Sequence, residues 1–169
     1  MITSTKIRQA VEMEDGFVIY INGMRLNKLR ALPRYLMAGL KVGKMFDRLA
    51  ADPDSGFLGY EPALMGPRHG AAIQYWRSLE DIRRFASDPG DMHVPAWQWF
   101  NERDDGGLAF WSELYVIEPE NYETFFRNVE GVGLSRFGRM VPMEEHERQL
   151  GLAGSVVAAE EPVVADGGT

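Results

Sequence analysis

An α+β fold with an antiparallel sheet is the fold class that the sequence predicts, and three features predict it. Four stretches of β-branched and aromatic residues have the length and composition of strands. Two segments between them carry apolar residues at helical spacing and end at clusters of Asp, Pro and Gly. In chain order these elements give β, α, β, β, α, β, which is the order of the ferredoxin-like split βαβ unit.

The composition is that of a globular protein with one domain. The chain has 169 residues, of which 45% are hydrophobic and 25% are charged. No run approaches the roughly 18 consecutive apolar residues of a membrane span, and the first residues lack the apolar region of a secretory signal. We therefore expect a cytoplasmic protein with no membrane partner.

The net charge and the lack of cysteine narrow the chemistry. A net charge of −7 disfavours nucleic acid as a partner, because the basic stretches are interleaved with core positions or acids. The absence of cysteine excludes disulfides, thiolate metal sites and cysteine nucleophiles. Chemistry is left to histidine, carboxylate, amide and aromatic side chains, or to a bound cofactor.

The first strand is predicted over Phe17 to Leu26, after a polar N-terminal arm or edge segment over 1–15. Alternation along this strand places Tyr20 and Asn22 on the same face. Asn22 is the polar exception in an otherwise apolar row, which makes it a candidate for contact with a ligand.

A long helix is predicted from Pro33, and it ends at the breaker over 52–56. Gly39 and Gly43 are four residues apart and share a face of this helix. Either their missing side chains allow a neighbouring backbone to approach closely, or the helix tolerates two glycines. The apolar positions expected to face the sheet are Leu36, Leu40, Met45, Phe46 and Leu49.

Three more strands complete the predicted sheet. The stretch over 57–65 contains Pro62, which favours an edge position because proline cannot donate a ladder hydrogen bond. The stretch over 71–77 carries Trp76, and the fourth strand is predicted over 108–117.

Shorter helices are predicted around these strands. Ser78 and Asp81 have the spacing of a capping box and begin one helix, and Pro95 begins another. Pro119 is expected to begin a last helix, whose inward residues would be Tyr122, Phe125, Phe126 and Val129. We expect one domain over 16–150, followed by a disordered tail over 151–169 that is rich in small and acidic residues.

The patterns of the strands predict a pocket and a dimer. Both faces of the first and third strands are apolar, so the face away from the helices needs a cover, and the same sheet of a second subunit is the simplest one. This arrangement is a homodimer. Between the sheet and its own helices a cavity can remain, lined by large side chains and suited to an apolar or aromatic ligand.

His93, Asn22 and Trp76 are the candidate catalytic residues. His93 could transfer a proton or bind iron, or it could only cap the helix that begins at Pro95. Asn22 could bind a substrate or an oxygen species, or it could be satisfied by neighbouring backbone. The aromatic residues expected to contact the substrate are Tyr20, Trp97, Phe100 and Trp111.

The other two histidines are expected at the surface. His69 lies in a predicted loop, and His146 lies among acids and an arginine. No HxxxH or HxH spacing occurs, so a metal site made of several histidines is not expected.

Several segments together resemble a known family. They are the strand FVIYINGMRL, the segment YWRSLEDIRRFASDP with the following His93 and Trp97, the strand FWSELYVI and the closing GVGLSRFG. These segments resemble the DUF4188 proteins, which are grouped with antibiotic-biosynthesis-type monooxygenases, over residues 14–150. The resemblance implies a dimeric α+β barrel of ferredoxin-like subunits.

A more distant resemblance is to the haem-degrading monooxygenases of the same superfamily. In those enzymes the site consists of an Asn on the first strand, a Trp at the end of the third strand and a His after the next helix. Asn22, Trp76 and His93 stand at comparable places, although the segment from Trp76 to His93 is longer here and contains Pro89 and Gly90.

Three functions therefore remain open. The first is an oxygenase that needs no cofactor and oxidises an apolar, aromatic or polyketide-like substrate, with Asn22 and Trp76 orienting the substrate and His93 exchanging protons. The second is a haem protein with His93 as the axial ligand. The third is a binder of apolar ligands that has no catalytic activity and shares only the fold.

Overall fold

The computed structural model describes residues 8–88, 93–102, 105–119 and 121–150. Contacts divide the chain into two compact units. The first is Asp15–Ile117, and the second joins the N-terminal residues up to Glu14 to the residues from Glu118 onward. This division differs from the single domain expected over 16–150, because N-terminal and C-terminal segments pair with each other.

The first unit contains a four-stranded antiparallel sheet. Its strands are β2 (Phe17–Leu26), β3 (Phe57–Gly66), β4 (His69–Trp76) and β5 (Leu108–Ile117), in the order β3-β4-β2-β5. This order, with a helix after the first and third of these strands, is the ferredoxin-like arrangement, so the predicted fold class is confirmed. Strand β3 lies at an edge, as Pro62 predicts.

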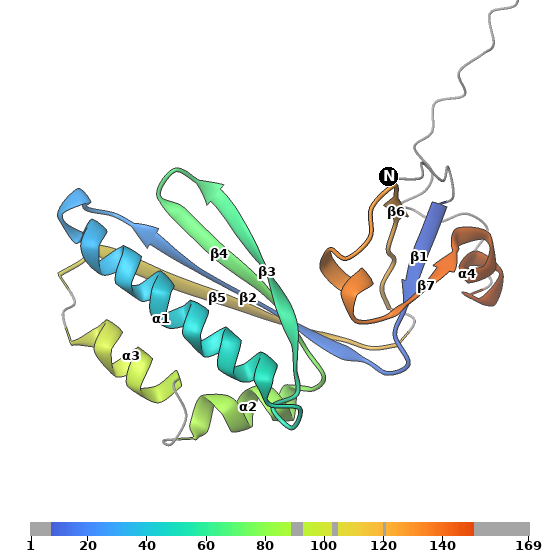
Figure 1. Cartoon of the computed structure of the whole chain (residues 1–169), viewed down its shortest axis with the longest axis horizontal. Coiled ribbons are helices and arrows are strands. Elements are labelled where there is room, and N and C mark those ends of the chain that lie inside the picture. Colours follow the sequence, from blue (N-terminus) through green and yellow to red (C-terminus); the bar gives the residue numbers. More distant parts are fainter. Residues whose placement is uncertain (1–7, 89–92, 103–104, 120, 151–169) are drawn as a thin grey trace, which may run out of the picture. The chain divides into compact units, whose positions relative to one another are not determined.

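Helices cover one face of this sheet (Figure 1). A short 3-10 helix (η1, Leu29–Ala31) leads into α1 (Leu32–Ala51), and α2 (Leu79–Ser87) and α3 (His93–Asn101) precede β5. The core between the layers contains Val18, Met45, Phe46, Leu49, Phe57 and Trp76. These side chains come from the helix-facing positions of the strands and from one side of α1.

Two of the five apolar positions predicted to face inward from α1 are exposed. Met45, Phe46 and Leu49 are buried, whereas Leu36 is 57% exposed and Leu40 is 69% exposed. The N-terminal half of this helix is therefore apolar on its outer side as well, and a pattern of apolar residues cannot show which side meets the sheet.

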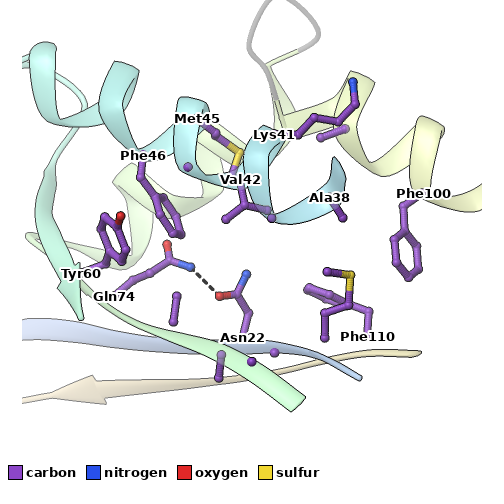
Figure 2. Close-up of a pocket in the computed structure, with 18 of the residues that line it drawn as sticks. Asn22, Ala38, Lys41, Val42, Met45, Phe46, Tyr60, Gln74, Phe100 and Phe110 are labelled. Carbon is purple, nitrogen blue, oxygen red and sulfur yellow. Dashed lines mark hydrogen bonds between the residues drawn. The ribbon is translucent and has the colours of Figure 1, made fainter. Parts of the chain in front are cut away.

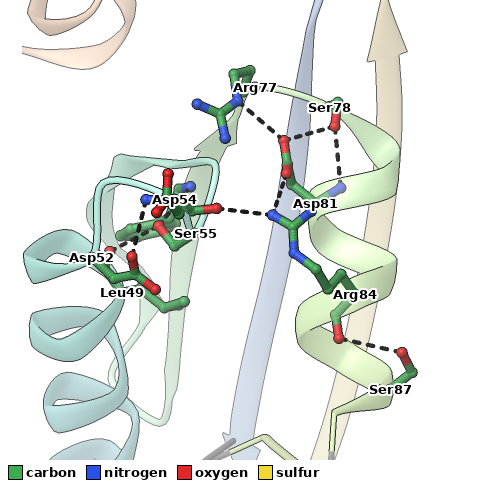
Figure 3. Close-up of polar contacts among 10 residues, drawn as sticks. Leu49, Asp52, Asp54, Ser55, Arg77, Ser78, Asp81, Arg84 and Ser87 are labelled. Carbon is green, nitrogen blue, oxygen red and sulfur yellow. Dashed lines mark hydrogen bonds and ion pairs between the residues drawn. The ribbon is translucent and has the colours of Figure 1, made fainter.

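The start of α2 is fixed by a polar network (Figure 3). The Ser78 hydroxyl accepts a hydrogen bond from the Asp81 main-chain N–H at 3.1 Å, as the capping spacing predicts. Asp81 is buried and pairs with Arg77 and Arg84. Arg84 also donates to the main-chain oxygen of Asp54 at 2.9 Å, which ties α2 to the loop between α1 and β3.

The second unit is built on a three-stranded sheet in the order β6-β1-β7. Its strands are β1 (Arg8–Glu12), β6 (Phe126–Arg127) and β7 (Arg139–Pro142), accompanied by η2 (Gly133–Arg136) and α4 (Met143–Leu150). The polar start of the chain thus contains a central strand where an arm or edge segment was expected. The predicted tail over 151–169 lies outside the described residues.

The prediction of a helix after Pro119 is wrong. Residues 121–131 include the short strand β6, which pairs with β1. The Thr124 hydroxyl accepts from the main-chain N–H of Val11, and the Tyr122 hydroxyl accepts from that of Met13, both at 2.7 Å. These bonds satisfy one N–H of β1 and one just after it, across more than a hundred residues of sequence. This distant pairing overrides the local helical spacing.

Among the described residues, no helix is long and apolar enough to cross a membrane.

Candidate functional site

A cavity of about 360 Å³ lies between the sheet of the first unit and the helices that cover it (Figure 2). Residues of β2, β3, β4 and β5 and of the helices α1, α2 and α3 line it. Most of the lining is aliphatic or aromatic, which confirms an apolar pocket at the place that the strand pattern predicted.

A relay of two amides runs from the core to the floor of the cavity. The Trp76 indole N–H donates to Gln74 Oε1 at 3.1 Å, and Gln74 Nε2 donates to Asn22 Oδ1 at 3.0 Å. Strand register sets this geometry, because Gln74 lies opposite Tyr20 on β2, and Asn22 is diagonal to it. Both Trp76 and Gln74 are almost completely buried.

The indole fixes the direction of the whole relay. An indole N–H can only donate, so Gln74 must present its oxygen to Trp76 and its nitrogen to Asn22. Asn22 then accepts with its oxygen and leaves its own amide N–H₂ unused by the described residues. Figure 2 shows this nitrogen turned away from Gln74 and toward the part of α1 that carries Ala38 and Val42. Asn22 therefore offers a hydrogen-bond donor to an occupant of the cavity.

His93 also lines the cavity, at the first residue of α3. Its Nδ1 lies 3.2 Å from the main-chain oxygen of Ala86, and its ring packs edge-on against Phe85 at a centroid distance of 5.3 Å. A carbonyl oxygen can only accept, so Nδ1 carries the hydrogen, and the neutral ring keeps a lone pair on Nε2. The described bond of His93 thus reaches the end of α2, not the start of the Pro95 helix that it was expected to cap, and it leaves Nε2 available for a chemical role.

Aromatic side chains form the end of the cavity near α3. Trp97 and Phe100 stack at a centroid distance of 5.7 Å, and Phe110 of β5 meets Trp97 edge-on at 5.4 Å. Tyr20 lines the cavity from β2. Three of the four residues expected to contact the substrate, Tyr20, Trp97 and Phe100, therefore lie in the cavity wall.

Two predicted site residues do not line the cavity. Trp76 is 0% exposed and packs in the core on Phe57 and Phe85, so it reaches Asn22 only through Gln74. Trp111 lies on the sheet face away from the helices, since its neighbours on β5 alternate between the two faces. Its indole N–H donates to His69 Nε2 at 2.6 Å.

Sequence reasoning missed Gln74 and the glycines of α1 as features of the site. Gln74 shares the alternating face of Trp76, but its bond to Asn22 depends on a register that one strand cannot reveal. Gly39 and Gly43 line the cavity, and nothing lies within 4 Å of the Cβ that either would carry. No neighbouring backbone approaches them, so their missing side chains enlarge the cavity.

The other histidines are placed differently from their predicted surface positions. His69 begins β4 and is held by Trp111. His146 is 6% exposed, with Nδ1 3.3 Å from a carboxylate oxygen of Glu12. Within the described ranges, no group of three or more His, Asp or Glu side chains could hold a metal ion.

The sequence matches the family model of monooxygenase af470-like proteins over residues 17–134. No curated protein sequence matches the chain significantly.

Solved structures of aldoxime dehydratases have a similar fold. The complex of the aldoxime dehydratase OxdRE with butyraldoxime has a TM-score of 0.58 and 17% identity, and the match covers 83% of this chain and 39% of that chain. A second aldoxime dehydratase structure has a TM-score of 0.55 and 13% identity, covering 80% of this chain and 39% of that chain. This chain thus spans about two fifths of the length of those proteins. At this identity the likeness shows the fold alone.

A lower similarity is found with SnoaB, a cofactor-independent oxygenase from Streptomyces nogalater. Its TM-score is 0.43 at 16% identity, and the match covers 59% of this chain and 91% of SnoaB.

Proposed function

Because the chain belongs to the monooxygenase af470-like family, we propose that it is a monooxygenase that oxidises a small apolar substrate of aromatic or polyketide type inside the cavity. The single observation that carries this proposal is the amide N–H of Asn22, which the relay from Trp76 aims into an otherwise apolar cavity. Asn22 is half-buried and its N–H₂ faces the cavity, so an apolar ligand that displaces water from this end of the cavity should offer the amide an acceptor.

The reaction that fits this site begins at an acidic carbon next to a carbonyl group. His93 Nε2 accepts a proton from that carbon, and the Asn22 N–H stabilises the negative charge that develops on the carbonyl oxygen. The carbanion is a strong reductant in an apolar cavity. A methylene then becomes a carbonyl, one atom of O₂ enters the product, and the other leaves as water. The substrate supplies all four electrons, so the balance requires no cofactor.

Oxygen uptake with anthrone, a tricyclic ketone with one doubly activated methylene, tests this proposal. We expect one O₂ consumed for each anthraquinone formed. Asn22→Ala and His93→Ala should each lower kcat about a hundredfold or more, which is a typical effect of losing an oxyanion donor or a general base.

Asn27→Ala is the matched control, because Asn27 bonds to Gly106 outside the cavity. Unchanged uptake in both site variants would remove the site assignment. Binding of anthrone without oxygen uptake would instead favour the binder without catalytic activity.

A haem protein is the second candidate, and one observation favours it. Histidines that bind metals commonly donate their other ring N–H to a carbonyl group, as His93 does to Ala86. In this case His93 Nε2 would hold the iron, and haem would supply the oxidative chemistry. Lys41 is the only charged residue in the described lining of the cavity, so it is the available partner for a haem carboxylate. A Soret band that appears on adding haem and is lost in His93→Ala would support this function.

A further inference from the structure

An uncovered apolar surface lies beside the cavity of the first unit. Leu32, Leu36 and Leu40 of α1 are 43, 57 and 69% exposed, and Leu64 and Met65 of β3 are 80 and 58% exposed. We call these five residues the apolar rim. Large apolar side chains gathered on one surface usually mark a place of contact.

The two parts of the rim are neighbours. The Tyr35 hydroxyl of α1 accepts a hydrogen bond from the main-chain N–H of Gly70 at 3.0 Å, and Arg68 O accepts from Leu26 N at 2.8 Å. These bonds hold the turn between β3 and β4 against the start of α1. The exposed residues of both elements therefore belong to the same end of the unit.

One side of α1, which contains both rim residues and cavity residues, links the rim to the cavity. We call this side the flank. Phe46 lies on it and packs on Tyr60 of β3 with 4.2 Å between ring centroids, so the flank faces β3. In its middle, Gly39 and Gly43 line the cavity with nothing within 4 Å of an added Cβ. Gly39 is exposed and also lines the cavity, so the cavity opens to the surface at this glycine, beside the rim. Spacings of three and four place these residues on the flank: Leu32, Leu36, Gly39, Gly43 and Phe46.

Two cations, Lys44 and Arg68, lie near the rim in a part of the chain that is rich in basic residues. Between Gly16 and Phe46 the sequence contains six Lys or Arg and no Asp or Glu, although the whole chain has a net charge of −7. Lys44 lies one turn beyond Leu40, and Arg68 lies in the turn after β3. Both are exposed, and neither forms an ion pair with a described carboxylate.

Asp105 offsets part of this charge. It lies 3.6 Å from Arg30, and its main-chain oxygen accepts a hydrogen bond from Lys28. A hydrogen bond from the main chain of Gly107, together with the nearby cations, lowers the pKa of Asp105, so it stays ionised. Asp47, an exposed residue of α1, lies three residues after Lys44, and no ion pair between the two is described.

We propose that the apolar rim docks on an anionic lipid surface, from which an apolar substrate enters the cavity through the opening at Gly39. Leucine and methionine side chains insert at the boundary of the acyl chains, while Lys44 and Arg68 contact anionic headgroups. Docking of this kind requires no helix that crosses the membrane, so it departs from the expectation of no membrane partner, which rested on the lack of such a helix. The entry of substrate rests on the proposed function of the cavity, whereas the docking does not.

Sedimentation of the full chain with lipid vesicles tests the docking. We expect binding to vesicles of phosphatidylcholine with added phosphatidylglycerol, weaker binding to phosphatidylcholine alone, and weakening as salt rises. The double substitution Leu36→Glu with Leu40→Glu should lower vesicle affinity about tenfold or more. Lys44→Glu with Arg68→Glu should abolish the preference for anionic vesicles.

Val116→Glu is the matched control for added charge. Val116 is 52% exposed, and it pairs with Val18 at the end of β2 that is away from the rim. The Val116→Glu variant should bind vesicles as the unchanged chain does.

Two results would overturn the proposal. One is the absence of binding to anionic vesicles, or binding that Leu36→Glu with Leu40→Glu leaves intact. The other is a fall in the molecular mass of the free protein in that variant, because a second copy would then be the cover of the rim. Failure of anthrone oxidation with docking intact would instead contradict only the proposed function.

Discussion

At the scale of single residues, Asn22 depends on two residues behind it. Its amide has no preferred direction of its own, because rotation exchanges a donor for an acceptor of similar size. Trp76 removes this freedom through Gln74, since an indole can only donate. We therefore expect Trp76 to act as a positioning residue, and its place in the core explains why a tryptophan predicted to be catalytic does not line the cavity.

Trp76→Phe tests this positioning role. Phenylalanine keeps the ring contacts with Phe57 and Phe85 but frees both amides to rotate. If the two orientations of Asn22 become equally populated, the affinity for a carbonyl ligand such as anthraquinone should fall about twofold. Asn22→Ala should cause a larger loss.

The same variant should also lower the free energy of unfolding by about 1–3 kcal/mol, because Gln74 Oε1 loses its buried partner. Calorimetric titration and urea unfolding measure the two effects. If Trp76→Phe lowered the affinity for anthraquinone as much as Asn22→Ala does, an indirect role of Trp76 would be contradicted.

At the scale of elements, the two glycines of α1 exchange stability for cavity space. Glycine in a helix costs about 1 kcal/mol relative to alanine. Because nothing lies within 4 Å of an added Cβ, Gly39→Ala and Gly43→Ala should each raise the free energy of unfolding by about 0.5–1 kcal/mol. They should also weaken the binding of tricyclic ligands, which denaturation and titration measure.

Gly23→Ala is the contrasting control. Its Cβ would overlap the indole ring of Trp111, so this change should destabilise the protein. Tighter binding of tricyclic ligands in Gly43→Ala would show that the glycine does not provide cavity space.

The network at the start of α2 predicts a dependence of stability on pH. Burial opposes the ionisation of Asp81, but hydrogen bonds from Ser78, Arg77 and Arg84 outweigh it and lower its pKa below the ordinary value of 3.8. A lowered pKa in the folded state means that ionised Asp81 stabilises the fold above the pKa of the unfolded chain. This stabilisation is lost as the pH falls through the folded value.

Asp81→Asn should therefore be less stable than the unchanged chain at neutral pH, by about 1–3 kcal/mol. The difference should shrink when the pH falls below about 4. Urea unfolding at several pH values measures it, and a difference that does not change with pH would contradict a stabilising charge on Asp81.

At the scale of the whole molecule, the face of the first sheet away from the helices predicts a homodimer. Ile19, Ile21 and Ile73 alternate onto this face and are only half-buried, and Tyr115 beside them is 47% exposed. The sequence alone already places apolar residues there, and the structure leaves them uncovered by the first unit. The sheet of a second copy remains the proposed cover.

Ile21→Glu should convert a dimer into a monomer, because it places a charge in the centre of this face. Analytical ultracentrifugation at micromolar concentration measures the mass. Leu36→Glu serves as the control and should leave the dimer intact. A monomer in the unchanged chain would contradict the predicted barrel.

The sequence by itself determined the first unit. Alternation and helical spacing are local signals, so the four strands, α1 and the capped α2 could be predicted from their own residues, and their order led to the ferredoxin-like fold. The same signals placed Asn22 on the face toward the helices. They failed where distant pairing overrides local spacing, as in residues 121–131, which pair with β1.

Only the tertiary structure decided how the site is assembled. Register brought Gln74 beside Asn22, and packing put Trp76 behind them both and Trp111 on the opposite face. It also left Leu36 and Leu40 exposed beside the opening at Gly39. The physical reason is that an alternating or helical pattern fixes which residues share a face, whereas the partner of that face depends on contacts between segments far apart in the chain.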